Sequence, residues 1–211
     1  MNGTNPTARL IYVHDPMCSW CWAFRPACEQ LQAGLPAAVA FERLLGGLAA
    51  DDDAPMAEAM REHLRRTWRR IQERVPGTHF NFDFWERCRP RRSTWPACRA
   101  VIAARAQAPA REDDMILAIQ RAYYLDARNP SEASTLVELA GALGLDAARF
   151  SSDLGAPATA RVLQEEIATA RGLGVDSFPS LVLEYGASRW PIPVDYRDAR
   201  PMLGLIETLL A

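Results

Sequence analysis

Residues 10–35 read LIYVHDPMCSWCWAFRPACEQLQAGL, an apolar run followed by two cysteines and a segment with helical periodicity. The apolar run predicts a buried β-strand, and residues 22–35 predict a helix. Cys18 and Cys21 therefore lie where a strand passes into a helix. Two thiols separated by two residues can close a disulfide within one helical turn, and the helix dipole stabilises a thiolate at the N-terminus. This arrangement indicates thiol–disulfide exchange, which needs one thiol to attack and another to resolve.

Within this pair we expect Cys18 to attack, because it lies at the start of the helix with its sulfur exposed. Cys21, one turn further in and more buried, would resolve the mixed disulfide. Zinc sites use the same cysteine spacing, but a structural zinc ion needs two further ligands. The sequence contains no second CxxC pair and no HxxxH pair, so we predict no metal site.

Two prolines support the redox interpretation. Pro26 falls inside the expected helix, where it removes a backbone hydrogen bond and should kink the helix. Far downstream, residues 174–183 read GVDSFPSLVL and bring the Phe178–Pro179 bond directly before an apolar strand. A cis bond is accessible before proline, and here it would leave the Phe178 backbone free to pair with a substrate strand. The alternative is an ordinary turn proline at Pro179.

Three further residues are candidates for tuning the thiols or binding substrate. Ser19 and Trp20 lie between the cysteines and bring no charge, and Ser19 can donate toward the Cys18 sulfur, so we expect an intermediate reduction potential. All 24 basic residues are arginine, so no lysine can support a thiolate. The remaining sources of positive charge are the helix dipole, Arg25 and His14. His14 could equally be a partly buried histidine that ends the strand.

Composition restricts the class of protein. With 211 residues, 49% of them hydrophobic, the chain can bury a full core as one domain or as a domain with an insertion. The net charge of −2 gives no reason to expect nucleic acid or a membrane surface as a partner, and the arginines of residues 61–74 alternate with glutamates as in a solvated, ion-paired helix face. No apolar run is long enough for a membrane span. Residues 1–9 lack signal-peptide features, so we expect a cytoplasmic protein without a structural disulfide framework.

The remaining pattern predicts the other elements. Residues 9–14 and 38–45 predict two strands around the cysteine helix, which makes a β-α-β unit with a parallel pair. Residues 51–172 show helical periodicity, and we expect no strand there. The β-pattern returns at 180–184 and 189–194, before a last helix at 201–210. The helices expected in the middle stretch cover residues 56–75, 94–102, 113–126, 131–143, 146–154 and 157–171.

The CxxC motif, the helix proline five residues later and the downstream proline turn, taken in this order, resemble the thioredoxin superfamily. A thioredoxin-like chain interrupted by helices after its second strand is similar to the DsbA family. The resemblance implies an α/β protein with a thioredoxin-like fold and a large all-helical insertion between strand two and the cis-Pro turn. It divides the chain into a discontinuous thioredoxin-like domain, residues 1–50 and 173–211, and a helical insertion domain, residues 51–172.

More narrowly, the chain is similar to the cytosolic DsbA-like proteins described as predicted protein-disulfide isomerases, near the FrnE-like group. The resemblance rests on residues 13–26, 91–99 and 177–182. The chain departs from that group at Ser19, where relatives commonly carry proline, and at Cys98, where their pattern has histidine. That pattern directs Cys98 toward the active-site face and makes it a candidate third redox thiol. The alternative for Cys98 is an inert core cysteine.

The resemblance implies a thiol–disulfide oxidoreductase or protein-disulfide isomerase that acts on thiols and disulfides of proteins or small molecules. It requires no metal or organic cofactor, and glutathione is a candidate co-substrate. Two other functions stay open. One is a glutathione-dependent transferase or isomerase, like the kappa class and the 2-hydroxychromene-2-carboxylate isomerases, although those enzymes typically present serine at the first thiol position. The other is a non-enzymatic, redox-responsive binding module.

Overall fold

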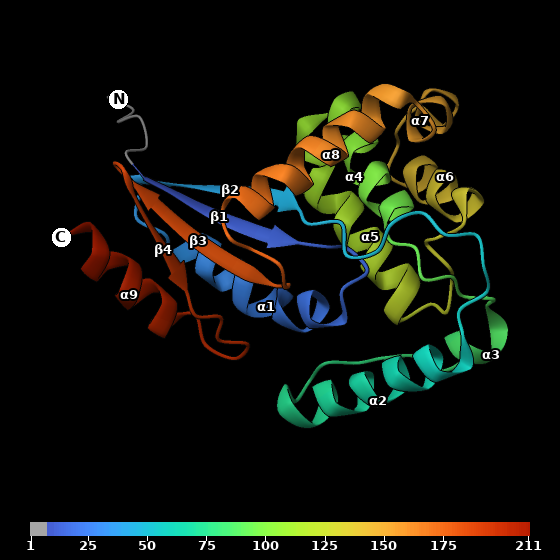
Figure 1. Ribbon diagram of the computed structural model, residues 1–211, viewed down its shortest axis with the longest axis horizontal. Coiled ribbons are helices and arrows are strands. Elements are labelled where there is room, and N and C mark those ends of the chain that lie inside the picture. Colours follow the sequence, from blue (N-terminus) through green and yellow to red (C-terminus); the bar gives the residue numbers. More distant parts are fainter. Residues whose placement is uncertain (1–7) are drawn as a thin grey trace.

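The apolar run before the cysteines becomes an internal strand of a four-stranded sheet in the computed structural model, which describes residues 8–211 (Figure 1). The sheet order is β2-β1-β3-β4, with β1 parallel to β2, and with β3 antiparallel to both of its neighbours. The strands are β1 (Ala8–His14), β2 (Val39–Leu45), β3 (Ser180–Tyr185) and β4 (Ser188–Ile192). All predicted strands are confirmed to within two residues. The expectation that there is no signal peptide concerns a segment that lies almost wholly outside the described residues.

Helices cover both faces of the sheet (Figure 1). Successive strand residues point to opposite faces, so β1 contributes to two hydrophobic clusters. Leu10 and Tyr12 pack with the apolar residues of α1 (Ser19–Gly34) and α9 (Arg200–Leu210). Ile11 and Val13 pack on the other face with the end of α8. Because both faces of β1 are buried, the strand is almost continuously apolar rather than alternating.

The middle of the chain is helical, as predicted. Its elements pack around a third and larger core that contains the fully buried Trp68, Trp85 and Tyr124. The helix α3 and the 3₁₀ turn η1 were not expected from the periodicity, because each is shorter than two helical turns. The helical elements of this stretch are α2 (Glu58–Arg74), α3 (Phe84–Arg87), α4 (Trp95–Gln107), η1 (Pro109–Arg111), α5 (Glu112–Tyr124), α6 (Ala133–Ala142), α7 (Ala147–Leu154) and α8 (Pro157–Gly172).

Helix α8 contributes to the core of the helical part and to the cluster on one face of the sheet. Its residues Leu163 and Ile167 pack into the helical core, whereas Ala170 packs against the sheet together with Val175 and Val182. The buried Glu166 of the same helix accepts a hydrogen bond from the backbone N–H of Leu45 at 2.8 Å, at the end of β2. This helix therefore ties the insertion to the end of the sheet at which β1 and β2 both finish.

Within residues 8–211, every helix is too short or too polar to span a lipid bilayer. The cysteines at positions 18, 21, 28, 88 and 98 are all free thiols in this structure.

Candidate active site

The two cysteines of the CxxC motif lie at the start of α1, directly after β1. Cys18 is the N-cap residue, with φ −79° and ψ 117°, and the helix begins at Ser19. The expected start at residue 22 is therefore three residues late. The reason is the short turn after β1, in which the Cys18 N–H donates to the Asp15 carbonyl at 3.0 Å. Pro26 lies inside α1, as predicted.

The environment of the Cys18 sulfur favours its thiolate. The Cys21 thiol donates a hydrogen bond toward it, and this contact is the main reason that the pKa of Cys18 is lowered. The backbone N–H groups of Cys21 and Trp20 act in the same direction, while burial and the negative charge of Asp15 oppose them. Cys18 is only 7% exposed, so the expectation of an exposed sulfur is wrong. The hydrogen bonds outweigh the desolvation because they point at the sulfur from within one helical turn.

Cys21 shows the opposite behaviour. It is 1% exposed, and burial together with the neighbouring Cys18 raises its pKa well above the ordinary value. The two shifts are opposite, so Cys21 holds its proton more tightly than Cys18 does. This asymmetry suits an attacking Cys18 thiolate and a Cys21 thiol that reacts second.

The downstream proline turn lies against Cys18. The Phe178–Pro179 peptide bond is cis, and the Cys18 sulfur lies 3.5 Å from the Phe178 carbonyl oxygen, which accepts a hydrogen bond from Cys18 when this thiol is protonated. The Phe178 ring occupies the space next to Gly46, where an added Cβ atom would approach the ring to 2.1 Å. Among residues 8–211 the Phe178 N–H has no hydrogen-bond partner. The structure thus brings together residues 160 positions apart in the chain and leaves one backbone donor unused beside the thiols.

The two residues between the cysteines face different parts of the molecule. The buried Ser19 hydroxyl accepts a hydrogen bond from the Trp68 indole N–H at 2.9 Å. This contact ties the cysteine turn to α2, and it leaves the expected donation from Ser19 toward Cys18 as a prediction. Trp20 is half-buried, with its ring 5.2 Å from that of Tyr196 and 5.9 Å from the Arg70 guanidinium. Trp20 therefore forms part of the surface beside the thiols.

His14 does not supply positive charge to the thiolate. Burial, followed by the charges of Arg43, Arg25 and Arg105, lowers its pKa from 6.5 to about 3, so the ring is neutral near pH 7. The ring stacks on Tyr12 at 5.0 Å. His14 and Cys21 line the same small cavity of about 20 Å³. The interpretation of His14 as a buried histidine that ends the strand fits these observations.

Arg25 also does not act on the thiolate through its charge. Its guanidinium forms ion pairs with Glu29 at 2.9 Å and with Asp113 at 3.3 Å. The lowering of the Cys18 pKa therefore rests on hydrogen-bond donors at the helix start rather than on a cationic side chain.

Asp15 has a larger part in the site than the sequence indicates. Its carboxylate is fully buried and accepts hydrogen bonds from the N–H groups of Met17 and Leu48, each at 2.8 Å, and from the Thr94 hydroxyl at 2.6 Å. Burial raises the pKa of Asp15, and these donors partly offset the rise. Asp15 thus joins the cysteine turn, the end of β2 and the start of α4. An Asp-Pro pair one residue before the CxxC motif is the only sequence signal of this role.

Cys98 also lies beside the Asp15 carboxylate, in the interior of the protein. Its sulfur is 3.5 Å from the Asp15 carboxylate oxygen, and none of the residue is exposed. Burial and then the charge of Asp15 raise the pKa of Cys98 well above the ordinary value. The family pattern thus predicts that Cys98 lies close to the cysteine turn. Its complete burial favours the alternative in which Cys98 is a core cysteine.

Comparison with known proteins shows the family of the chain. A family model described as thioredoxin matches residues 11–188. The curated relatives include the ClpXP adapter protein SpxH of Halalkalibacterium halodurans, which is 26% identical over 172 residues, or 80% of this chain and 56% of that protein. The chain therefore spans little more than half the length of this relative.

Two solved structures share the fold over nearly their whole length. A protein from Nitrosomonas europaea, proposed to be a protein disulfide isomerase, has 28% identity and a TM-score of 0.83, over 97% of this chain and 98% of that one. The cytosolic disulfide reductase DsbM from Pseudomonas aeruginosa has 24% identity and a TM-score of 0.76, over 96% and 98%. DsbM has also been solved with GSH. The predicted DsbA-like fold is confirmed by these similarities.

Proposed function

The chain belongs to the thioredoxin family, and we propose that it is a thiol–disulfide oxidoreductase of the DsbA-like type with Cys18 as nucleophile and Cys21 as resolving thiol. The observation that carries the assignment is the position of Cys18 and Cys21 at the start of α1, with the Cys18 sulfur 3.5 Å from the carbonyl oxygen of Phe178 before the cis proline; the opposite pKa shifts of the two thiols support it. The similarity to the Nitrosomonas europaea structure supports the reaction class.

The reaction proceeds in two exchanges. The Cys18 thiolate attacks one sulfur of a substrate disulfide, a mixed disulfide forms, and the other substrate sulfur leaves as a thiolate that takes up a proton. Cys21 then loses its proton and attacks the Cys18 sulfur, which releases the second substrate thiol. Two electrons pass to the substrate, and the protein keeps a Cys18–Cys21 disulfide. Two molecules of a reducing thiol such as glutathione return it to the dithiol and leave as a disulfide.

The fate of the mixed disulfide distinguishes reductase from isomerase. If Cys21 attacks first, the substrate leaves reduced. If a second substrate thiol attacks first, the substrate leaves with a rearranged disulfide and Cys18 is a thiolate again. The high pKa of Cys21 slows its attack, because a thiol must lose its proton before it reacts. This property favours a mixed disulfide that lasts long enough for isomerisation.

The Phe178 peptide group provides a place for the substrate backbone. Its N–H is free among the described residues, and its carbonyl lies beside Cys18. An extended substrate segment can pair with this group as an added strand, which holds a disulfide over the Cys18 sulfur without selecting a side chain. We place the reaction in the reducing cytoplasm, as the name of DsbM indicates for that protein.

The test is a redox titration of the purified protein in glutathione buffers of graded ratio, with alkylation and mass spectrometry of residues 18 and 21. We expect a reversible two-electron transition between roughly −270 and −120 mV, the range from thioredoxin to DsbA. Cys18→Ser should abolish exchange, while the matched variant Cys88→Ala, which removes a thiol far along the chain, should retain it. A protein whose thiols show no reversible transition, or a Cys18→Ser variant with full exchange activity, contradicts the proposal.

The curated relatives supply a second candidate function, since SpxH is a ClpXP adapter protein. In this case the chain binds a partner protein, and thiol chemistry at most regulates the binding. The adapter function would be favoured if the double variant Cys18→Ser/Cys21→Ala still captures a partner protein and the wild type shows no thiol–disulfide exchange. The glutathione-dependent transferase or isomerase remains an alternative that conjugation of a chromogenic electrophile tests directly, and we expect no conjugation.

A further inference from the structure

Helix α2 carries an excess of positive charge that the redox reaction itself does not use. It contains six arginines and three glutamates, in a chain whose net charge is −2. The sequence favoured a solvated, ion-paired face for this helix. The structure bears this out only for the first part of the helix, where Arg61 pairs with Glu58 at 3.0 Å and Arg66 pairs with Glu62 at 3.5 Å.

The last two arginines of the helix behave differently. Arg70 and Arg74 are exposed, and within residues 8–211 neither has a carboxylate oxygen within 4.0 Å. The exposed Arg197, on the segment between β4 and α9, likewise has no such partner in the described part of the chain. These three residues, Arg70, Arg74 and Arg197, are called here the cationic rim.

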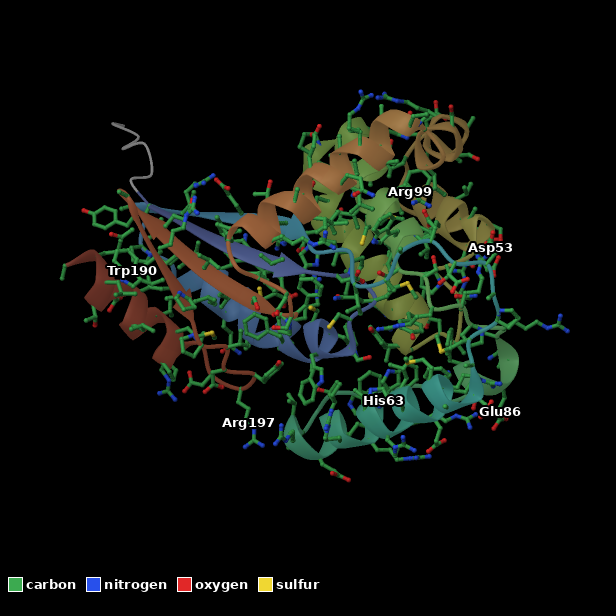
Figure 2. The ribbon with its side chains drawn as sticks, in the orientation of Figure 1. Asp53, His63, Glu86, Arg99, Trp190 and Arg197 are labelled. Atoms are coloured by element: carbon green, nitrogen blue, oxygen red, sulfur yellow. The ribbon has the colours of Figure 1, made fainter. Side chains whose placement is uncertain are left out.

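The rim is held together and lies beside the thiols. The Arg197 Nε donates to the Arg74 carbonyl at 3.1 Å, so the β4–α9 segment is fixed to the end of α2. Figure 2 shows Arg197 at the gap between this segment and α2, with its guanidinium directed away from the sheet. The Arg70 guanidinium lies 5.9 Å from the ring of Trp20, the residue that directly precedes Cys21. Positive charge therefore stands next to the surface over which a substrate must approach Cys18.

Nearby acidic residues do not neutralise the rim by direct pairing. The Asp195 carboxylate accepts the backbone N–H groups of Arg197 at 2.8 Å and Asp198 at 3.1 Å, so it is directed into its own turn. Glu73 forms no ion pair of 4.0 Å or less among the described residues. The guanidinium groups of the rim thus retain donors for an external anion.

The surface next to the rim has room for a peptide. A cavity of about 550 Å³ lies between α1, the end of α2 and the β4–α9 segment, and its lining includes Trp22, Pro26, Val75, Tyr196 and Arg197. Its walls are mostly apolar and also include Arg25 and Glu29, which pair with each other at 2.9 Å, so Arg197 adds the charge that has no carboxylate partner among the described residues. Aromatic and proline surfaces of this kind accept the backbone and apolar groups of a peptide, while arginine selects its charged groups.

From this geometry we propose that the preferred substrates are disulfides flanked by carboxylates, which the cationic rim attracts and binds. The inference rests on the proposed function, because it assigns the substrate class of the same site. Arginine forms forked, charge-assisted hydrogen bonds with carboxylates, and a patch of one sign raises the local concentration and the association rate of the opposite sign. Acidic segments of proteins and small acidic peptides such as glutathione share this chemistry.

The experiment compares the initial rate of reduction, as kcat/KM, for three fluorescent peptide disulfides that differ only in having Asp, Asn or Lys on both sides of the cysteine. We expect the wild type to favour the Asp peptide over the Lys peptide by roughly tenfold or more at low salt, and to lose most of this preference at 0.5 M salt, where charges are screened within a few ångströms. The double variant Arg70→Gln/Arg74→Gln should reduce the Asp peptide about tenfold more slowly and the Asn peptide at nearly the wild-type rate.

The control is Arg66→Gln, which removes an exposed arginine of the same helix that is paired with Glu62. It should leave the order of the three peptides unchanged. Glutathione disulfide as a fourth substrate shows whether the carboxylates belong to small peptides or to proteins. If its rate of reduction also falls in the Arg70→Gln/Arg74→Gln variant, the substrates are small acidic peptides. If its rate does not change, they are acidic segments of proteins. Equal rates for all three peptides, or an equal loss for all three in the double variant, overturn the inference. A wild type that reduces none of them overturns the proposed function instead.

Discussion

Cys18 and Cys98 lie in similar places and have opposite properties. Each is at the start of a helix, Cys18 as the N-cap of α1 and Cys98 in the first turn of α4, and each lies near the buried Asp15. The pKa of Cys18 is lowered, whereas that of Cys98 is raised well above the ordinary value. Proximity to a helix N-terminus therefore does not by itself make a thiol reactive.

The difference lies in the groups that face each sulfur. Cys18 receives hydrogen bonds from the Cys21 thiol and from two backbone N–H groups. Cys98 faces the Asp15 carboxylate, which repels a thiolate and accepts the thiol hydrogen bond instead. The backbone N–H of Gly47 also acts on Cys98 and lowers its pKa, but burial and the Asp15 carboxylate outweigh this donor. Donors stabilise the charged sulfur, and an acceptor stabilises the neutral one.

The largest effect that this comparison predicts is in the rate of alkylation. With excess iodoacetamide at pH 7, Cys18 should react at least ~100-fold faster than Cys98, because only a thiolate reacts and Cys98 is both neutral and buried. Peptide mapping of each site over time gives the two rates. Cys98 should become reactive only when the protein unfolds in denaturant. Similar rates at the two cysteines in the native protein would break the comparison.

A smaller effect concerns the pH dependence of stability. His14 has a pKa of about 3 in the folded protein and near 6.5 when unfolded, so between these values only the unfolded state binds the proton. The free energy of unfolding should therefore fall as pH falls from 6.5 toward 3, by about 1.4 kcal/mol per pH unit from this group. In the His14→Gln variant, the free energy of unfolding should lose the part of its pH dependence that is due to this residue. Urea unfolding at several pH values measures the change.

The same variant tests whether His14 contributes to the lowered pKa of Cys18. If donors rather than a cationic histidine lower the pKa of Cys18, His14→Gln should leave the thiolate titration of Cys18 nearly unchanged. A large rise of the Cys18 pKa in this variant would show that His14 supplies charge after all.

The smallest effect is expected from Asp15→Asn. Removal of the negative charge should lower the pKa of both cysteines, and more so at Cys98, where the carboxylate is in direct contact. The alkylation rate of Cys18 near pH 7 should rise by less than ~10-fold, since the hydrogen bonds that dominate its pKa are retained. Thiolate absorbance against pH measures both changes, with Thr94→Val as a control that removes a partner of Asp15 and keeps its charge. A slower reaction of Cys18 in Asp15→Asn would contradict the assigned direction of the Asp15 effect.

Most elements of the fold follow from local patterns. Periodicity predicted the strands and the longer helices, since a buried face repeats at a fixed spacing along the chain. It failed where a contact distant in sequence decides the boundary. Thr94 is the residue type that usually caps a helix and it does precede α4, but its hydroxyl donates to Asp15 and makes no capping hydrogen bond with the helix. The early start of α1 at Ser19 depends on the turn that Asp15 closes.

The thioredoxin-like fold and the position of the paired thiols follow from the sequence alone, because a CxxC pair between a strand and a helix, together with a distant Phe–Pro–Ser turn, is legible in residue type and spacing. Only the tertiary structure decided which groups act on each thiol. The opposite pKa shifts of Cys18 and Cys98, the neutrality of His14 and the contact of Ser19 with Trp68 all depend on burial and on partners far along the chain. Desolvation and hydrogen bonding act through space, and residues brought together by folding leave no spacing rule in the sequence.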